Sequence, residues 1–147
     1  MALLENKKAR LEYEILETYE AGIELYGHEV KSVRGGKGSL IGAHIVIRGN
    51  EAYLVGATVS PYQQGNVPKS YDPERTRRLL LSRKELRELE GADSRKGLTL
   101  IPLMVYNKNR FLKLSFGLAR KKKAHDKRAA LKDRDAARDM DRTLKGE

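Results

Sequence analysis

The glycine-rich stretch Gly35-Gly-Lys-Gly-Ser39 is a candidate for phosphate chemistry, because the backbone amides of such loops can surround a phosphate group. A nucleotide-binding P-loop ending at Lys37 needs Gly at position 31 and Ser or Thr at position 38, but the chain has Lys31 and Gly38. No buried strand precedes the stretch. We therefore interpret it as a turn that ends a helix and exposes a lysine, and we expect no nucleotide cofactor.

The histidines and carboxylates do not form a catalytic or metal-binding pattern. His28, His44 and His125 lack the spacing of metal ligands, and the chain has no cysteine. His44 alternates with apolar residues, which indicates a half-exposed strand position. Four glutamates could bind Mg²⁺ in a nuclease, but a solvated strand face explains them better: Glu12, Glu14, Glu17 and Glu20. We expect no catalytic residue, no metal and no other cofactor.

Positive charge is the strongest functional signal. The chain has 30 Lys and Arg against 20 Asp and Glu, and its pI is about 9.8. Residues 120–147 alone hold eleven Lys or Arg and six Asp or Glu, a net +5. Such a segment cannot bury enough apolar surface to fold alone, and it favours a polyanionic partner. No lipidation motif, signal peptide or membrane span accompanies the charge, so the prediction is a cytoplasmic protein without membrane or small-molecule partners.

Strand-like patterns surround these charges. Residues 11–25 alternate with period two, and a break at Leu16–Thr18 indicates a bulge. Val30 and Val33 predict a short helix over 27–34, ended by 35–38. Further along, the sequence predicts a hairpin of 43–48 and 52–59 around Gly49-Asn50, followed by a loop over 60–73. A strand is predicted over 77–81, and a capping box at Ser82–Glu85 begins a helix that continues to about Glu90. The last two predicted strands cover 98–106 and 111–119 and are joined by a turn at 107–110.

Six or so strands with two or three short helices predict a mainly β fold. A closed antiparallel barrel of the OB type is favoured, because closure leaves no open sheet edges. The predicted domain spans residues 1–119 and the basic tail 120–147. We expect four aromatic residues to fill the core: Tyr13, Tyr53, Phe111 and Phe116. Since the aromatic residues form no cluster of the RNP type, sequence-specific reading of single strands is not predicted.

Six motifs follow one another along the chain. They are Tyr13-Glu-Ile-Leu-Glu-Thr-Tyr-Glu-Ala-Gly-Ile23, Gly27-x-Glu-Val-Lys-Ser-Val-Arg34 with Gly36-Lys37, Ser60-Pro-Tyr62, Asp72-Pro-x-Arg-Thr-Arg-Arg-Leu-Leu-Leu81, Lys96-Gly-Leu-Thr-Leu100 and Asp126-Lys-Arg128. Together they resemble the SsrA-binding protein family, the protein partner of transfer-messenger RNA in bacterial ribosome rescue. The resemblance covers nearly the whole chain from about Asn6 into the tail.

The resemblance implies a barrel that grips the tRNA-like domain of that RNA. It also implies a body that occupies the decoding centre of a stalled ribosome, and a tail that enters the empty mRNA channel. The implied RNA-binding residues are Glu20, Gly22, Glu29, Lys31, Ser32, Arg34, Lys37, Leu80 and Lys113. The implied ribosome-binding residues are Arg120, Lys121, Lys122, Lys123, His125, Asp126, Lys127, Arg128, Arg134, Arg138 and Arg142.

Two residues depart from the family pattern. His28 replaces a Thr or bulky apolar residue, and Lys121 replaces a glycine at the junction of body and tail. In a helical tail Arg134, Arg138 and Arg142 would form one basic ridge, and we expect that helix only on a ribosome. The alternative function is a structural ribosomal protein, which would share the small barrel and the basic tail.

Overall fold

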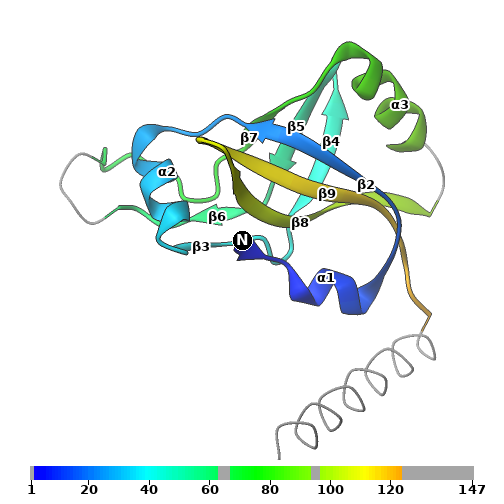
Figure 1. The fold of residues 1–147 in the computed structure, drawn as a ribbon, viewed down its shortest axis with the longest axis horizontal. Coiled ribbons are helices and arrows are strands. Elements are labelled where there is room, and N and C mark those ends of the chain that lie inside the picture. The colour runs from blue at the N-terminus through cyan, green and yellow to red at the C-terminus, as the bar shows by residue number, and fades with distance from the viewer. Residues whose placement is uncertain (1, 63–66, 94–96, 124–147) are drawn as a thin grey trace, which may run out of the picture.

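The computed structural model describes residues 2–62, 67–93 and 97–123. This part of the chain contains three helices and nine strands (Figure 1). In chain order they are β1 (Ala2–Glu5), α1 (Lys7–Glu12), β2 (Tyr13–Ile23), α2 (Gly27–Arg34), β3 (Gly38–Ser39), β4 (His44–Arg48), β5 (Glu51–Val55), β6 (Thr58–Val59), β7 (Arg77–Leu80), α3 (Arg83–Asp93), β8 (Leu98–Lys108) and β9 (Phe111–Lys121). The prediction of a mainly β fold with a few helices is confirmed.

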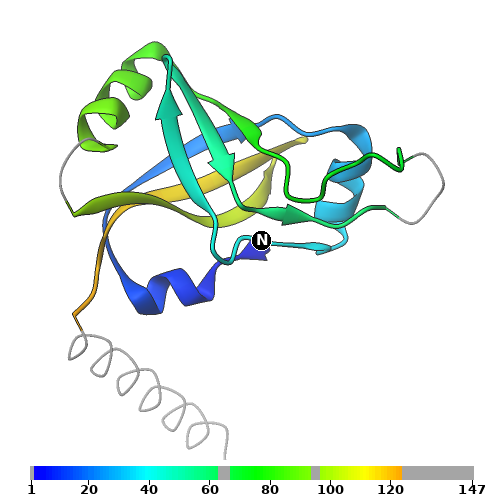
Figure 2. The ribbon, with the colours of Figure 1, turned by 180° about the vertical axis from the view of Figure 1, so that it is seen from behind.

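The strands of the larger sheet are linked in a ring. Antiparallel pairings run in the order β8, β4, β5, β7, β2 and β9, and β9 pairs with β8 again. β1 adds to the other edge of β8, and β3 pairs with β6 in a small separate sheet. Figure 1 shows β2 and β9 side by side, and Figure 2 shows the β4–β5 hairpin from behind. The ring brings α2 and the β8–β9 turn to one end of the molecule.

The main hydrophobic core fills the interior of the ring. Phe116 is fully buried and stacks on Tyr19 with ring centroids 5.5 Å apart. Tyr13 and Tyr53 are half-buried. The prediction that Phe111 fills the core was wrong, since 70% of this residue is exposed. The alternation of β9 explains the difference, because Leu112, Leu114 and Phe116 point inward and Phe111 lies on the opposite face.

The N-terminal segment differs from the predicted pattern. Residues 11 and 12 end helix α1 rather than begin a strand, and neither β1 nor α1 was predicted. Asn6 caps α1, since its Oδ1 accepts from the Ala9 N–H at 3.2 Å, and its Nδ2 donates to Pro102 O at 2.9 Å. The predicted bulge in β2 is confirmed, because the pairing with β9 skips Leu16.

The turns follow the sequence closely. Gly49 and Asn50 both have positive φ in the β4–β5 hairpin, as the Gly-Asn pair predicts. Gly56, with φ of 84°, splits the predicted strand 52–59 into β5 and β6. The Ser82–Glu85 capping box is formed, and α3 continues to Asp93, beyond the expected end. β7 ends one residue early, and β8 and β9 each run two residues longer than predicted.

His44 is exposed rather than half-exposed. Within the described ranges, three or more potential metal-ligating side chains never gather into a cluster. The helices of these ranges are all too short or too polar to cross a bilayer.

Candidate nucleic-acid interface

An open groove of about 890 Å³ runs across β2, β7 and β9 to the start of α3. It brings together four of the predicted RNA-binding residues: Glu20, Gly22, Leu80 and Lys113. They come from three strands that are distant in sequence. Gly22 of β2 pairs with Leu80 of β7 on one side and with Lys113 of β9 on the other. The sheet register therefore places these side chains next to one another.

Gly22 allows Leu80 to lie across the strand. A Cβ at position 22 would come within 3.2 Å of Leu80 Cβ, a distance that would force the leucine to move. Leu80 is 51% exposed and forms an apolar ledge beside the cations of the groove. The close contact between Gly22 and Leu80 explains why a glycine and an exposed leucine lie together in the groove.

The carboxylate of Glu20 is held in place by β8. It accepts hydrogen bonds from the Tyr106 hydroxyl and from Lys108 Nζ, the latter at 3.0 Å. These bonds hold the pKa of Glu20 below its ordinary value, while partial burial and the bond to Glu20 raise the pKa of Tyr106 to about 12. Glu20 is thus an exposed, ionised acceptor at neutral pH. Sequence reasoning missed Tyr106 and Lys108, because they lie 86 and 88 residues away.

The exposed cations of α2, Arg34 and Lys31, contact two different parts of the protein. Arg34 donates through Nη2 to Arg110 O at 3.1 Å, so its guanidinium joins the helix to the β8–β9 turn. Lys31 lies over the Tyr62 ring, with Nζ 5.6 Å from the centroid. Lys37 follows the helix and is exposed, and its backbone carbonyl accepts from the Ser60 N–H at 3.1 Å, two residues before Tyr62. Lys31 and Lys37 therefore both lie next to the chain that follows β6.

Glu29 and Ser32 are buried, unlike the other predicted RNA-binding residues. The Glu29 carboxylate accepts from Arg75, from Arg77 Nη2 at 2.7 Å and from the Tyr71 hydroxyl at 2.9 Å. Its Oε1 also accepts from the Tyr26 N–H at 2.8 Å, which closes the first turn of α2. This arrangement anchors α2 to the chain between β6 and β7. A direct contact of Glu29 with a surface ligand would require these bonds to break.

The hydrogen bonds to Glu29 determine its ionisation. Burial alone would raise the pKa of this carboxyl, but the bonds from Arg75, the Tyr26 amide, Arg77 and Tyr71 outweigh burial and lower the pKa to about 2. Arg77 is itself fully buried. Sequence reasoning missed this arginine, because Arg77-Arg-Leu-Leu-Leu81 has no polar–apolar alternation that would mark position 77 as inward.

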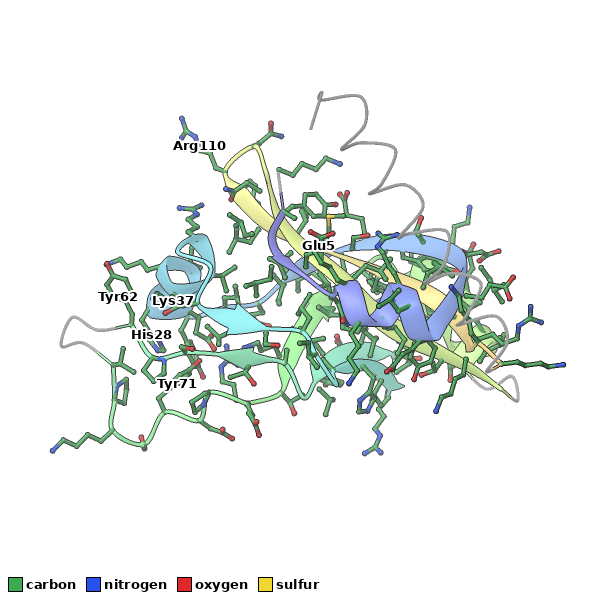
Figure 3. The ribbon with its side chains drawn as sticks, turned by 90° about the horizontal axis from the view of Figure 1, so that it is seen from below. Glu5, His28, Lys37, Tyr62, Tyr71 and Arg110 are labelled. Carbon is green, nitrogen blue, oxygen red and sulfur yellow. The ribbon has the colours of Figure 1, made fainter. Side chains whose placement is uncertain are left out.

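His28 packs at the edge of the same cluster. Its ring meets Tyr71 edge-on, with the ring centroids 4.7 Å apart (Figure 3). Among the described residues, neither its buried Nδ1 nor the buried Ser32 Oγ has a hydrogen-bond partner. The side chain of His28, the residue that departs from the family pattern, therefore faces the interior of the protein.

The start of the predicted tail continues the sheet. Arg120 and Lys121 belong to β9, and Arg120 pairs with Glu14 at 2.5 Å. The Lys122 N–H donates to Glu12 O at 2.8 Å, and Lys123 is exposed. The remaining predicted tail residues lie outside the described ranges: His125, Asp126, Lys127, Arg128, Arg134, Arg138 and Arg142.

By fold and surface, the protein is a small, basic, mainly β protein with cations along an open groove, the arrangement of polyanion-binding domains. Residues 3–146 match the family model described as SmpB protein. The chain therefore belongs to the SmpB family.

Similar proteins cover almost the whole chain. An SsrA-binding protein of Gloeothece citriformis is 51% identical over 143 residues, covering 97% of this chain and 92% of the relative. That of Psychrobacter sp. is 52% identical over 140 residues, covering 95% and 89%. A solved structure described as "tmRNA-SmpB: a journey to the center of the bacterial ribosome" matches with a TM-score of 0.70 and 47% identity, covering 86% of this chain and 92% of the other.

Proposed function

We propose that this protein is an RNA-binding adaptor that binds the tRNA-like domain of transfer-messenger RNA and delivers it to stalled ribosomes. The observation that carries the proposal is the groove in which Glu20, Gly22, Leu80 and Lys113 meet. Membership of the SmpB family supports it, as does the similarity to SsrA-binding proteins and to a chain of a tmRNA–SmpB structure.

The groove binds RNA through its charges and its shape. Lys113, Arg83 and Arg87, which line it, neutralise phosphates and release counterions, whereas Arg78 is already paired with Glu51. Such contacts position a nucleic acid without reading its sequence. The ionised Glu20 accepts hydrogen bonds from a base edge or a ribose hydroxyl, and Leu80 packs against a sugar or a base. Specificity then comes from the shape of a folded RNA.

The strand ring acts as an OB-like barrel, a fold that serves RNA in many proteins. Its body replaces an anticodon stem at the decoding centre, and the basic tail that follows β9 enters the empty mRNA channel. The tail becomes helical among the phosphates of the channel. The adaptor performs no catalysis, and it works in the cytoplasm where ribosomes are.

Purification of the tagged full chain tests the function. One small RNA, identified by sequencing as transfer-messenger RNA, is expected to co-purify, with the protein substoichiometric to ribosomes. The Leu80→Ala/Lys113→Ala double variant is expected to lose that RNA. Arg48→Ala, an exposed change in β4 outside the groove, is expected to retain it. One copy per ribosomal subunit without the small RNA would instead indicate a structural ribosomal protein.

A further inference from the structure

Phe111 is the most exposed of the large apolar side chains in the described ranges, at 70%. It is the first residue of β9, directly after the β8–β9 turn, where Asn109 has a φ of 59°. Burying an aromatic ring is strongly favourable, so a ring kept in water at a turn is available to a partner.

An apolar recess continues from Phe111 toward Leu80. Its volume is about 230 Å³, and Ile23, Val30 and Leu112 contribute to its walls. Leu80 is also half-exposed, so two apolar side chains border the recess at the surface. The recess shares Gly22, Leu80 and Lys113 with the larger groove and therefore lies at one end of it.

The charges around the recess are all positive. Arg34, Arg110 and Lys113 line it, and no carboxylate is among the residues that do. The larger groove differs, since Glu20, Glu51 and Glu85 line it beside its cations. The bond from Arg34 to Arg110 O fixes the turn against α2, and Figure 3 shows Arg110 pointing away from the body. A planar apolar surface surrounded by cations complements an aromatic ligand that carries negative charge.

We propose that this recess binds one unstacked base of the partner RNA, with the base stacked on Phe111 and its flanking phosphates on Arg110 and Lys113. The proposal rests on the proposed function and adds a stacking site to it. A phosphate-bearing base satisfies both the ring and the cations, whereas an apolar protein segment would satisfy only the ring. Stacking tolerates any base, because every base has a π face.

The chain has no tryptophan, so Phe111→Trp places a single indole at the site. Titration with the isolated tRNA-like domain of transfer-messenger RNA is expected to quench the indole fluorescence, with Kd within about threefold of the wild-type value because the aromatic surface is kept. Leu16→Trp, at another exposed apolar position in β2, is the control and is expected to give no quenching.

Truncation of the ring separates stacking from charge. Phe111→Ala is expected to weaken binding about 5- to 150-fold, the range for losing one stacked base. The slope of log K against log salt should stay unchanged, because no counterion-releasing group is removed. Arg110→Ala is expected to reduce that slope by about one, and Leu16→Ala to leave both affinity and slope unchanged.

The results distinguish the two proposals. Wild-type protein that fails to bind the RNA would overturn the adaptor function and the stacking site together. Tight wild-type binding with an unaffected Phe111→Ala variant, or an unquenched indole in the bound Phe111→Trp variant, would overturn the stacking site alone. Quenching by ribosomes without the RNA would also overturn it, since the ring would then face another partner.

Discussion

Glu29 is a buried carboxylate whose hydrogen-bond donors come from the start of α2 and from the chain around the start of β7. Arg75 donates from the segment before β7, Arg77 donates from the first position of β7, and the Tyr26 amide donates from the start of α2. Breaking a buried pair by removing one partner leaves an uncompensated charge, which costs about 3–5 kcal/mol. The position of α2, and with it the placement of Arg34, therefore depends on this carboxylate.

The pKa of Glu29 predicts an acid-sensitive stability. Because its folded-state pKa of about 2 lies below the ordinary 4.5, its contribution is complete above pH 4.5 and is lost as pH falls toward 2. The loss amounts to about 3 kcal/mol, from roughly 1.4 kcal/mol per pH unit. Urea unfolding across this range is expected to show it.

Two variants isolate this contribution. Glu29→Gln is expected to be less stable at pH 7 by about 3–5 kcal/mol, with a smaller further loss on acidification. Glu51→Gln removes an exposed pair with Arg78 and is expected to cost about 0–1 kcal/mol. Equal pH profiles for Glu29→Gln and the wild type would contradict the assignment.

The cations of α2 predict a salt-dependent contribution to RNA binding. Lys31→Ala/Arg34→Ala is expected to weaken binding and flatten its salt dependence, because fewer counterions are released. Stability should change by about 0.5 kcal/mol, as for most exposed charges. Binding isotherms at several salt concentrations measure both effects, with Lys7→Ala/Arg48→Ala as a control of equal charge. An unchanged affinity and slope in the folded variant would exclude these residues from the interface.

Among the strands, Gly117 permits the bulge in the pairing of β2 with β9. A Cβ there would lie 2.8 Å from Ile15 Cγ2 and 3.3 Å from Glu17 O, the two residues on either side of the bulge. No side chain fits without moving a backbone carbonyl. The close approach of the strands thus depends on glycine.

Gly117→Ala is therefore expected to destabilise the fold by about 1–3 kcal/mol, the cost of overpacking. Gly27→Ala is the matched control, because nothing lies within 4 Å of a Cβ at the start of α2 and alanine suits a helix. Thermal unfolding should lower Tm for the first variant only. Equal Tm values would mean that the bulge relaxes at no cost.

Local patterns predicted the elements whose determinants are local. The Gly49-Asn50 turn, the Ser82–Glu85 capping box and the break at Leu16 are all present. β1 and α1 were missed because Asn6 makes contacts across 34 and 96 residues, to Leu40 and Pro102. Helix α1 buries only Ala9, which leaves no periodic apolar face to recognise.

The family resemblance named candidate RNA-binding residues, whose role stays a prediction, but it did not reveal the strand pairing that places them together. Glu20, Gly22, Leu80 and Lys113 do line one groove. Composition marked Phe111 as core, although its place in the alternation of β9 exposes it. The motif around Glu29 did not reveal that its carboxylate points inward to Arg77. For Phe111 and Glu29, the result depends on which face of the strand or helix packs against the core.

The proposed function gives the body and the tail of the whole molecule separable roles. A chain ending at Lys123 keeps every described strand, so it is expected to fold and to bind transfer-messenger RNA with wild-type affinity. It is expected to fail in tagging, because the segment that occupies the mRNA channel is missing. An in vitro tagging assay on stalled ribosomes checks this. Full tagging by the truncated chain would remove the proposed role of the tail.

The strand ring closes through β9, which pairs with β2 on one side and β8 on the other. Among the described strands β9 is the last to be synthesised, so one edge of β2 stays open until a segment about a hundred residues later in the chain has been made. Contacts between segments so distant in sequence form slowly. A message broken before the codon for Phe111 would yield a chain in which β2 and β8 each lack the strand that covers one of their edges, and such open edges are prone to aggregate. The incomplete product of a broken message is the kind of stalled peptide on which the proposed tagging would act, so a protein of this architecture would depend on the pathway in which it is proposed to act.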